Sequence, residues 1–200
     1  MSKLFENDLA WLQKKGPFAG LDEAGRGALA GPVVVAAVVL DYNRPITGLN
    51  DSKLLSPAAR ESLFDQIQSS ALAFNIVRIR QGYIDRFNIL QATLLGFSNA
   101  FQKLEPAVQS CLIDGNHLPP DLKHCATAVI KGDSLHAAIA AASILAKVSR
   151  DKLMTEYDAV YPEYGFADHK GYGTPHHIRM IHSFGLCPIH RKSFRIPDLP

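Results

Sequence analysis

The apolar positions of this chain fall into short runs of strand length and longer stretches with helical periodicity. Residues 17–23 and 31–41 are two apolar runs separated by a glycine-rich turn, so they predict a hairpin. Residues 71–80 alternate well enough to predict a third strand, and the short apolar segments 110–114 and 125–130 predict two more.

Two helices are predicted between these strands. Ser56 followed by Pro57 is typical of a helix N-cap and first helical position, and this helix should run to about residue 69. Residues 83–104 have helical periodicity that is interrupted near Asn88, and the helix should end before Pro106.

Residues 136–157 form an alanine-rich run that is apolar nearly all round over part of its length. This composition predicts a long helix in the centre of the molecule. One more helix is expected over 175–183. Because consecutive strands come first and strands then alternate with helices, the sequence predicts an α/β fold, a mixed sheet with helices packed on it.

The length and composition favour one domain. A chain of 200 residues with 47% hydrophobic content is long enough for one packed α/β core, and no Pro/Gly/Ser-rich linker divides it. The apolar run 28–40 is too short to cross a bilayer, and the acidic N-terminus lacks a signal-like apolar core. We therefore expect one soluble domain over residues 1–200, with no membrane association.

The cysteines indicate a reducing compartment. Cys111, Cys125 and Cys187 make an odd number and lack C-x-x-C spacing, which fits reduced thiols better than a disulfide framework. The expected location is the cytoplasm.

The formal net charge of +2 is too small to argue for nucleic-acid binding by the whole surface. The distribution of charge is uneven, however, because the segment 169–197 contains five histidines and no Asp or Glu. We expect this C-terminal segment to face an anion. Its basic residues are Lys170, Arg179, Arg191, Lys192 and Arg195.

The first predicted strand ends on two adjacent carboxylates, Asp22 and Glu23. Buried charges are unfavourable unless a partner compensates them, and a divalent cation is a common partner. Both side chains can reach one ion only if the chain bends at Glu23, which the following glycines permit. Gly25 and Gly27 leave room for another backbone, and Arg26 could contact phosphate. The alternative is a surface turn in which Glu23 pairs with Arg26.

Three further aspartates are candidates for the same site. Asp114 follows a short buried strand, and acids at the ends of separate strands can converge on one point. Asp133 follows another strand near the start of the long helix, where the alternative role is helix capping. Asp151 is a weaker candidate because an i,i+4 ion pair with Lys147 explains it.

The donor types favour a hard cation. Four carboxylates, Asp22, Glu23, Asp114 and Asp133, without a His or Cys ligand set suit Mg²⁺ or Mn²⁺. Two such ions can activate water and stabilise the leaving oxygen in phosphodiester hydrolysis. A zinc site is disfavoured because the spacings of the C-terminal histidines and the nearby cysteine match no four-ligand pattern. Those residues are His176, His177, His182, His190 and Cys187.

Nine motifs give the chain its family resemblance, and they run in order through almost the whole sequence. The motifs are GLDEAGRG (20–27), GPVV (31–34), LNDSKLLS (49–56), LIDGN (112–116), VIKGDS (129–134), AAASILAKVSRD (140–151), YPEYGF (161–166), HKGYGTPH (169–176) and IHRKSF (189–194). With these motifs the chain resembles type 2 ribonuclease H, most closely the bacterial ribonuclease HII branch.

The resemblance implies a ribonuclease H-like fold with a mixed five-stranded sheet flanked by helices. It also implies endonucleolytic hydrolysis of RNA in RNA–DNA hybrids and cleavage on the 5′ side of single ribonucleotides in duplex DNA, leaving 3′-hydroxyl and 5′-phosphate ends. The quartet of metal-binding catalytic acids maps onto Asp22, Glu23, Asp114 and Asp133, with Mg²⁺ or Mn²⁺ as cofactor and two ions during catalysis.

The same resemblance implies how a junction is recognised. The backbone of Gly25, Arg26 and Gly27 together with Tyr172 would sense the 2′-hydroxyl, the group that distinguishes RNA from DNA. Taken without the resemblance, the segment around Tyr172 is a glycine-bracketed loop anchored by a half-buried ring.

Four other residues are expected to support substrate binding by the same resemblance. Lys53 and Ser143 would contact phosphates, although a lone lysine is usually solvated and a small residue in an alanine-rich helix mainly permits close packing. His190 and Arg191 would support either the site or the duplex phosphates, and the sequence leaves that choice open.

Two departures from the family pattern affect what is expected. The chain ends at Pro200, soon after Phe194, so the C-terminal helices by which some relatives hold substrate are expected to be short or absent. No substrate-binding domain precedes Phe18, which argues against the ribonuclease HIII branch. A monomer is expected. The rival functions are a DNA-only two-metal nuclease, which would not need Tyr172, and a non-catalytic hybrid-binding protein, which would not need the four acids.

Overall fold

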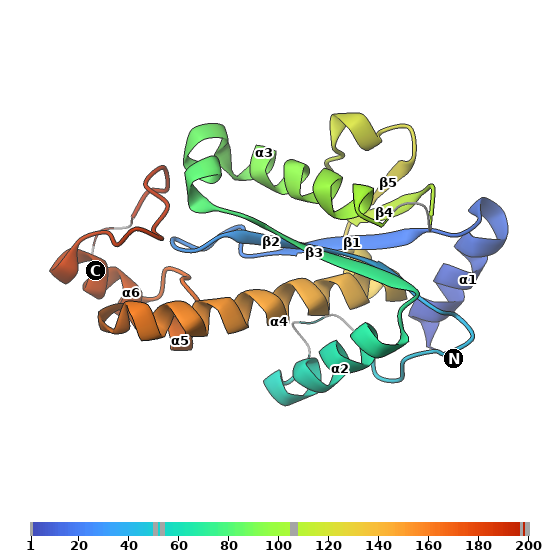
Figure 1. Ribbon diagram of the computed structural model, residues 1–200, viewed down its shortest axis with the longest axis horizontal. Helices are drawn as coiled ribbons and strands as arrows, with labels where there is room; N and C mark the ends of the chain where they lie inside the picture. Colours follow the sequence, from blue (N-terminus) through green and yellow to red (C-terminus); the bar gives the residue numbers. More distant parts are fainter. Residues whose placement is uncertain (1, 50–51, 53–54, 105–107, 197, 199–200) are drawn as a thin grey trace.

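The computed structural model describes residues 2–49, 52, 55–104, 108–196 and 198, and it is built around a five-stranded sheet (Figure 1). The strand order is β3-β2-β1-β4-β5. The first three strands pair antiparallel, whereas β4 pairs in parallel with β1 on one side and with β5 on the other. This confirms the predicted mixed sheet. The strands are β1 (Ala19–Ala24), β2 (Val33–Val39), β3 (Ala73–Ile79), β4 (Cys111–Asp114) and β5 (Ala126–Val129).

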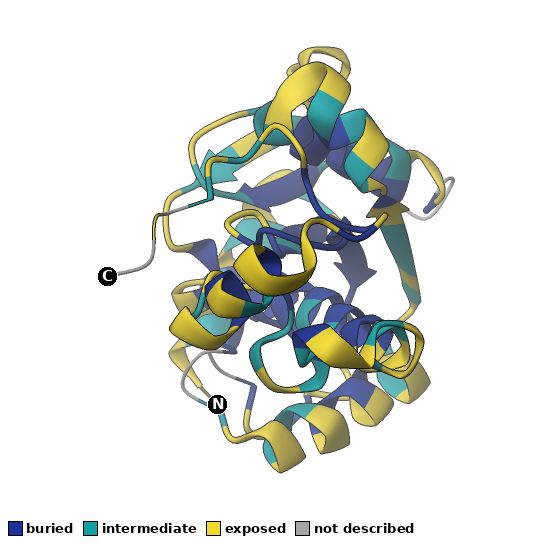
Figure 2. Cartoon of the chain, turned by 90° about the vertical axis from the view of Figure 1, so that its left-hand side faces the viewer, coloured by how far each residue is buried: buried dark blue, intermediate teal, exposed yellow. Residues whose placement is uncertain are grey.

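Helices cover both faces of the sheet. Helix α3 (Gln81–Gln102) lies on one face, and α2 (Pro57–Ser70) and α4 (Ala137–Val160) lie on the other (Figure 1). The period-two alternation of the strands sends Leu21 and Val35 toward α3, whereas Val38 packs with α2 and α4. Buried residues therefore occupy the strands and the inward sides of the helices, and the outward sides are exposed (Figure 2).

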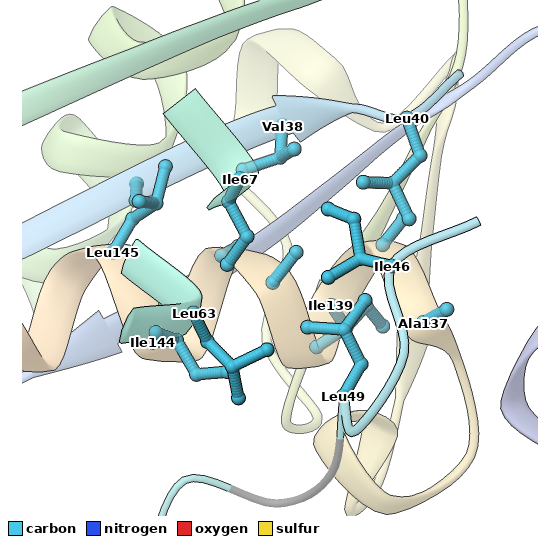
Figure 3. Packing of buried hydrophobic residues seen from close by; sticks show 14 of the residues in the cluster. Val38, Leu40, Ile46, Leu49, Leu63, Ile67, Ala137, Ile139, Ile144 and Leu145 are labelled. Carbon is cyan, nitrogen blue, oxygen red and sulfur yellow. The ribbon is translucent and has the colours of Figure 1, made fainter. Parts of the chain in front are cut away.

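The alanine-rich composition of α4 brings this helix close to the central strand. Ala138, Ala141 and Ala142 are fully buried. A Cβ added at Gly20 of β1 would lie 2.1 Å from the carbonyl carbon of Ala138, so the backbones of β1 and α4 are almost in contact. Larger side chains fill the space beside this contact, namely Val38, Leu63, Ile67, Ile144 and Leu145 (Figure 3). The predicted long central helix is thereby confirmed.

Local signals for helix ends and kinks are also borne out. The Ser56 side chain accepts a hydrogen bond from the Ala59 N–H at 3.2 Å and caps α2. Asn88 has a φ of 71° inside α3, and its side chain accepts a bond from the Gln91 N–H at 3.0 Å. The interruption predicted near Asn88 is therefore a kink with its own cap.

Helix α1 (Lys3–Lys15) was not predicted from the sequence. It is anchored by a buried carboxylate, because Asp8 accepts hydrogen bonds from Tyr42 Oη at 3.0 Å and the Ala138 N–H at 2.9 Å. His136 Nδ1 lies 2.7 Å from the same carboxylate. Helix α1 thus fixes the start of α4 at the end of the molecule opposite the β1–β2 turn (Figure 1).

Short helices build the other end of the molecule, next to the β1–β2 turn (Figure 1). These are α5 (Phe166–His169), α6 (Pro175–Phe184) and the 3₁₀ turn η4 (Pro162–Tyr164), while η2 (Pro120–Leu122) and η3 (Gly132–Ser134) precede and follow β5. None of the helices in the described ranges has the length and apolar composition needed to cross a membrane.

Candidate active site

The candidate site begins where β1 and β4 separate. The last pair between these strands is Leu21 with Ile113, and each strand then continues into acidic residues. Strand β1 carries Asp22 and Glu23, and β4 ends on Asp114. The bend expected at Glu23 is wrong, because β1 stays paired with β2 through Ala24 and the turn begins only afterwards.

A pocket of about 410 Å³ opens at this point. It brings together three of the four predicted acids with the predicted glycine-arginine-glycine turn, Ser143 and Tyr172. The residues that line it are Asp22, Glu23, Ala24, Gly25, Arg26, Gly27, Ser52, Arg60, Asp114, Ser143, Lys147 and Tyr172.

The acids in this pocket are buried close to like charges. Asp22 is only 5% exposed, and burial, reinforced by the negative charges of Glu23 and Asp114, raises its pKa well above the usual value. Burial also raises the pKa of Glu23, although Arg26, whose Nη1 lies 3.5 Å from Glu23 Oε1, opposes the shift. The Glu23–Arg26 pair predicted as the alternative therefore exists, but it does not make this segment a surface turn.

Hydrogen bonds hold the individual carboxylates in place. The Asp22 carboxylate accepts the Glu23 N–H at 2.7 Å and a bond from the Ser143 hydroxyl that favours its ionised form. Asp114 Oδ1 accepts the Gly132 N–H at 2.6 Å. These bonds orient the carboxylates but bring no positive charge to them.

Asp133 lies behind the pocket. It belongs to η3, is 4% exposed and does not line the cavity. The neighbouring Gly132 is the residue that donates to Asp114. The capping alternative for Asp133 is wrong, because His136 occupies the N-cap position of α4.

The donor set fits a hard divalent cation. Among the described residues, no three His, Cys, Asp or Glu side chains already stand in the arrangement of a metal site. The pocket nevertheless offers three carboxylates beside hydroxyl groups, and burial together with neighbouring like charges raises the pKa of Asp22 and Glu23. Mg²⁺ and Mn²⁺ prefer oxygen donors and would relieve this repulsion.

The C-terminal histidines form a hydrogen-bonded chain instead of a metal site. The Cys187 N–H donates to His190 Nδ1 at 2.9 Å, so the His190 proton resides on Nε2, 3.0 Å from His177 Nε2. His177 then donates from Nδ1 to the Tyr172 carbonyl at 3.0 Å. Burial lowers the pKa of both imidazoles to about 4, which keeps them neutral. His190 therefore supports the Tyr172 loop from inside the protein.

Arg191 also lies inside the protein. It is 1% exposed, and its guanidinium donates to three carbonyls: from Nη2 to Gly25 at 2.6 Å, from Nη1 to Arg26 at 2.8 Å and from Nε to Gly31 at 3.0 Å. Of the two roles left open by the sequence, this geometry favours support of the site over contact with duplex phosphates.

Tyr172 and Ser143 line the same pocket from different elements. The Tyr172 residue is 36% exposed, and its ring centre lies 5.3 Å from the Arg150 guanidinium carbon and 6.0 Å from Lys147 Nζ. The Ser143 hydroxyl is buried and lies 2.9 Å from that of Ser52. The ring of Tyr172 is thus available to a ligand, whereas Ser143 already contacts Ser52 and Asp22.

The remaining predictions concern lysines. Lys53 lies outside the described residues. Lys147 Nζ lies 2.8 Å from Asp151 Oδ1, so the predicted i,i+4 ion pair is confirmed and accounts for Asp151.

Sequence reasoning missed Arg60 and Arg150. Arg60 lines the pocket, and its Nη1 donates to the carbonyls of Ser52 and Leu55 at 2.8 and 2.7 Å. Arg150 is fully buried in α4. Its signal in the sequence is its place two helical turns after Ser143 in an apolar helix, which puts both residues on one face.

Comparison with known proteins gives a consistent result. The family model described as Ribonuclease HII matches residues 19–196. A ribonuclease HII of Ruminiclostridium cellulolyticum is 57% identical over 176 residues, covering 88% of this chain and 69% of the relative. A ribonuclease HII of a Marinomonas species is 54% identical over 176 residues, covering 88% of each protein.

Two solved structures share the fold. The ribonuclease H2 of Pyrococcus horikoshii superposes with a TM-score of 0.77 at 27% identity, covering 90% of this chain and 94% of that one. The ribonuclease HII of Archaeoglobus fulgidus, solved in a complex with PCNA, gives 0.77 at 25% identity, covering 91% and 96%. The ribonuclease H-like fold expected from the sequence is confirmed. The chain therefore belongs to the ribonuclease HII family, whose members are ribonuclease H-type hydrolases that act on RNA–DNA hybrids.

Proposed function

We propose that this chain is an endonuclease that cuts the RNA strand of hybrids and also cuts duplex DNA on the 5′ side of a single embedded ribonucleotide, leaving 3′-hydroxyl and 5′-phosphate ends. One observation carries this proposal. The acids at the ends of β1 and β4, of which Asp22 is buried, line the same pocket as the Gly25–Gly27 turn and Tyr172. The hydrolytic groups and the groups suited to recognise a 2′-hydroxyl thus face a common space.

In this proposal Asp22, Glu23, Asp114 and Asp133 hold Mg²⁺ or Mn²⁺. Two bound ions would supply an activated water and stabilise the leaving oxygen of the phosphodiester, so no covalent nucleophile is needed. Hydrogen bonds within the protein orient these metal-binding side chains: Ser143 donates to the carboxylate of Asp22, and the Gly132 N–H donates to that of Asp114. Such supporting hydrogen bonds tune metal ligands in many enzymes.

The Gly25–Gly27 turn suits contact with a nucleic-acid backbone. Within the described ranges, no backbone carbonyl accepts the N–H groups of Arg26 and Gly27. No atom lies within 4 Å of the place that a Cβ on Gly27 would occupy, so a ligand can approach the main chain closely. These donors and the Tyr172 ring supply the hydrogen bonds and the stacking surface that a ribose with its 2′-hydroxyl requires.

Positive side chains at the edge of the pocket would hold the phosphates. Arg26, Arg60 and Lys147 line it, whereas Lys53, which the family resemblance assigns to the same role, lies outside the described residues. Contacts of this kind position the strand without reading its sequence.

The test is cleavage of an end-labelled DNA duplex that contains one ribonucleotide, with Mg²⁺ or Mn²⁺. An all-DNA duplex and the Asp22→Asn protein are the controls. The proposal predicts one cut 5′ of the ribonucleotide by the wild type and none in either control. A cut in the all-DNA duplex would identify a DNA nuclease, and an uncut ribonucleotide duplex beside a cleaved RNA–DNA hybrid would restrict the activity to longer RNA tracts.

A further inference from the structure

A second cluster of buried charge lies directly behind the Gly25–Gly27 turn. Arg150 of α4 and Arg191 of the C-terminal segment are 0% and 1% exposed. Within the described ranges neither guanidinium is in an ion pair with a carboxylate, because the pairs found there involve other residues. Backbone carbonyls solvate both charges instead.

The two guanidinium groups donate hydrogen bonds to different carbonyls of the same loop. Arg150 donates to Ala30 at 3.0 Å and to Pro32 at 3.1 Å, and Arg191 donates to the intervening Gly31 at 3.0 Å. The two arginines therefore clamp the three residues that lead into β2.

Each arginine also reaches one half of the proposed recognition site. Arg191 binds the carbonyls of Gly25 and Arg26 in the turn. Arg150 donates to the Lys170 carbonyl at 2.9 Å, and its guanidinium carbon lies 5.3 Å from the ring centre of Tyr172. The relative placement of the turn and the tyrosine thus depends on two neighbouring planar groups.

The packing around these groups leaves little tolerance for movement. Gly25 has a φ of +94°, and a Cβ there would lie 2.0 Å from Arg150 Nε. A Cβ on Gly171 would lie 2.7 Å from the Ala30 carbonyl oxygen, and the Leu29 N–H donates to the Gly171 carbonyl at 2.8 Å. The turn, the Tyr172 loop and the two guanidinium groups are therefore in direct contact.

We propose that Arg150 and Arg191 are positioning residues that set the distance between the Gly25–Gly27 turn and Tyr172, so that selectivity for an RNA–DNA junction depends on both arginines although neither touches the substrate. This inference rests on the proposed function. Lysine would keep the charge, but it cannot replace a planar fork that donates to three carbonyls in fixed directions.

The experiment compares Arg150→Lys and Arg191→Lys with Arg44→Lys, an exposed arginine whose Nε lies 2.8 Å from Asp41. For each protein, kcat and KM are measured on a duplex with one ribonucleotide and on a continuous RNA–DNA hybrid. We expect the ratio of kcat on the junction substrate to kcat on the hybrid to fall roughly tenfold or more in the first two variants. The Arg44→Lys protein should keep the wild-type ratio.

A double-mutant cycle with Tyr172→Ala separates positioning from a general loss of stability. If the arginines act through Tyr172 and the turn, each lysine substitution should change the ratio much less in the Tyr172→Ala background. An unchanged ratio in a folded lysine variant, or effects that simply multiply in the double variant, would overturn the proposal. Should a lysine variant fail to fold, the corresponding glutamine variant, which keeps a planar donor group, is measured in its place.

The proposed function and the role of the two arginines are contradicted by different results. A wild-type protein that leaves the single-ribonucleotide duplex uncut contradicts the proposed function itself. A wild-type protein that cuts it, beside lysine variants with the wild-type ratio, contradicts only the role of the two arginines.

Discussion

The carboxylates of the pocket and the two arginines behind it are both clusters of buried like charge, but they are compensated differently. Arg150 and Arg191 together donate six hydrogen bonds to carbonyls within the protein. Asp22 and Glu23 instead have raised pKa values, chiefly because of burial and further because of neighbouring carboxylates, and Arg26 Nη1 lies 3.5 Å from Glu23 Oε1.

In the proposed function, this difference distinguishes the residues that support the backbone from those that carry the reaction. A charge whose hydrogen bonds are satisfied inside the protein fixes the backbone around it, as the arginines do for the turn. A group of carboxylates that repel one another is less stable alone and gains stability when a cation binds. In the proposed function, the protein thus places a turn held by arginines beside a cluster of carboxylates that would bind metal.

The largest expected effect is on catalysis at the carboxylates. Asp22→Asn or Asp114→Asn should lower kcat on an RNA–DNA hybrid roughly 1000-fold, because a metal contributes several kcal/mol of transition-state stabilisation. The melting temperature without metal should stay equal or rise, since one of three like charges is removed. A folded variant with near-normal kcat would contradict the assignment, and so would a collapse of the melting temperature.

Gly25 and Gly27 form a matched pair that tests the rigidity of the arginine-held turn. A Cβ at position 25 would clash with Arg150 at a positive φ, so Gly25→Ala should lower the free energy of unfolding by about 3 kcal/mol. Gly27→Ala meets nothing and should stay within about 0.5 kcal/mol of wild type, while cutting the single-ribonucleotide duplex more slowly. Equal unfolding free energies for the two variants, measured in denaturant, would show that Arg150 does not hold the turn.

The histidine chain offers a third form of compensation, because its buried groups stay neutral. The pKa of His177 and of His190 is lowered from 6.5 to about 4, and burial also lowers that of His169. The unfolded chain therefore binds more protons between these values, so their contribution to stability is complete above pH 6.5 and is lost as the pH falls through 4.

We expect protonation of this chain to remove at least about 3 kcal/mol of stability between pH 6.5 and 4, the equivalent of one such histidine. The measurement is the free energy of unfolding against pH for the wild type, His177→Gln and the exposed control His182→Gln. His177→Gln should show a shallower loss than the other two proteins. Identical pH profiles for all three would mean that the histidine chain does not depend on neutral imidazoles.

The smallest effect concerns Asp151, which lies outside the carboxylate cluster. Its ion pair with Lys147 is partly exposed, so Asp151→Asn should cost about 0.4 kcal/mol of stability and leave the metal dependence of cleavage unchanged. Asp133→Asn, by contrast, should abolish cleavage. If Asp133→Asn and Asp151→Asn change the dependence of the cleavage rate on Mn²⁺ concentration equally, the exclusion of Asp151 from the metal-binding residues is wrong.

The elements that the sequence predicts well are those whose pattern is local. Strand periodicity, the Ser56 cap and the interruption at Asn88 depend on neighbouring residues, and all are borne out. Helix α1 was missed although it carries apolar residues that pack on the core, and its anchor, Asp8, is bound by groups 34 and 130 residues away.

In the candidate site, too, the features that depend on neighbouring residues could be predicted, and those that depend on distant contacts could not. Acids at strand ends could be selected from the sequence because a charge after an apolar run is a local anomaly. The roles of Arg150 and Arg191 could not, since their hydrogen bonds span 20 to 166 residues and depend on the assembled sheet. The bend expected at Glu23 was wrong for a related reason, because pairing with β2 keeps that residue in the strand.

We expect the carboxylates of the pocket to bind a divalent cation. Calorimetric titration of Mn²⁺ into the wild type, Asp22→Asn and Asp151→Asn, in the absence of nucleic acid, tests it most directly. We expect saturable binding that is weakened about tenfold or more by Asp22→Asn and unchanged by Asp151→Asn. Identical titrations of the wild type and Asp22→Asn would contradict it.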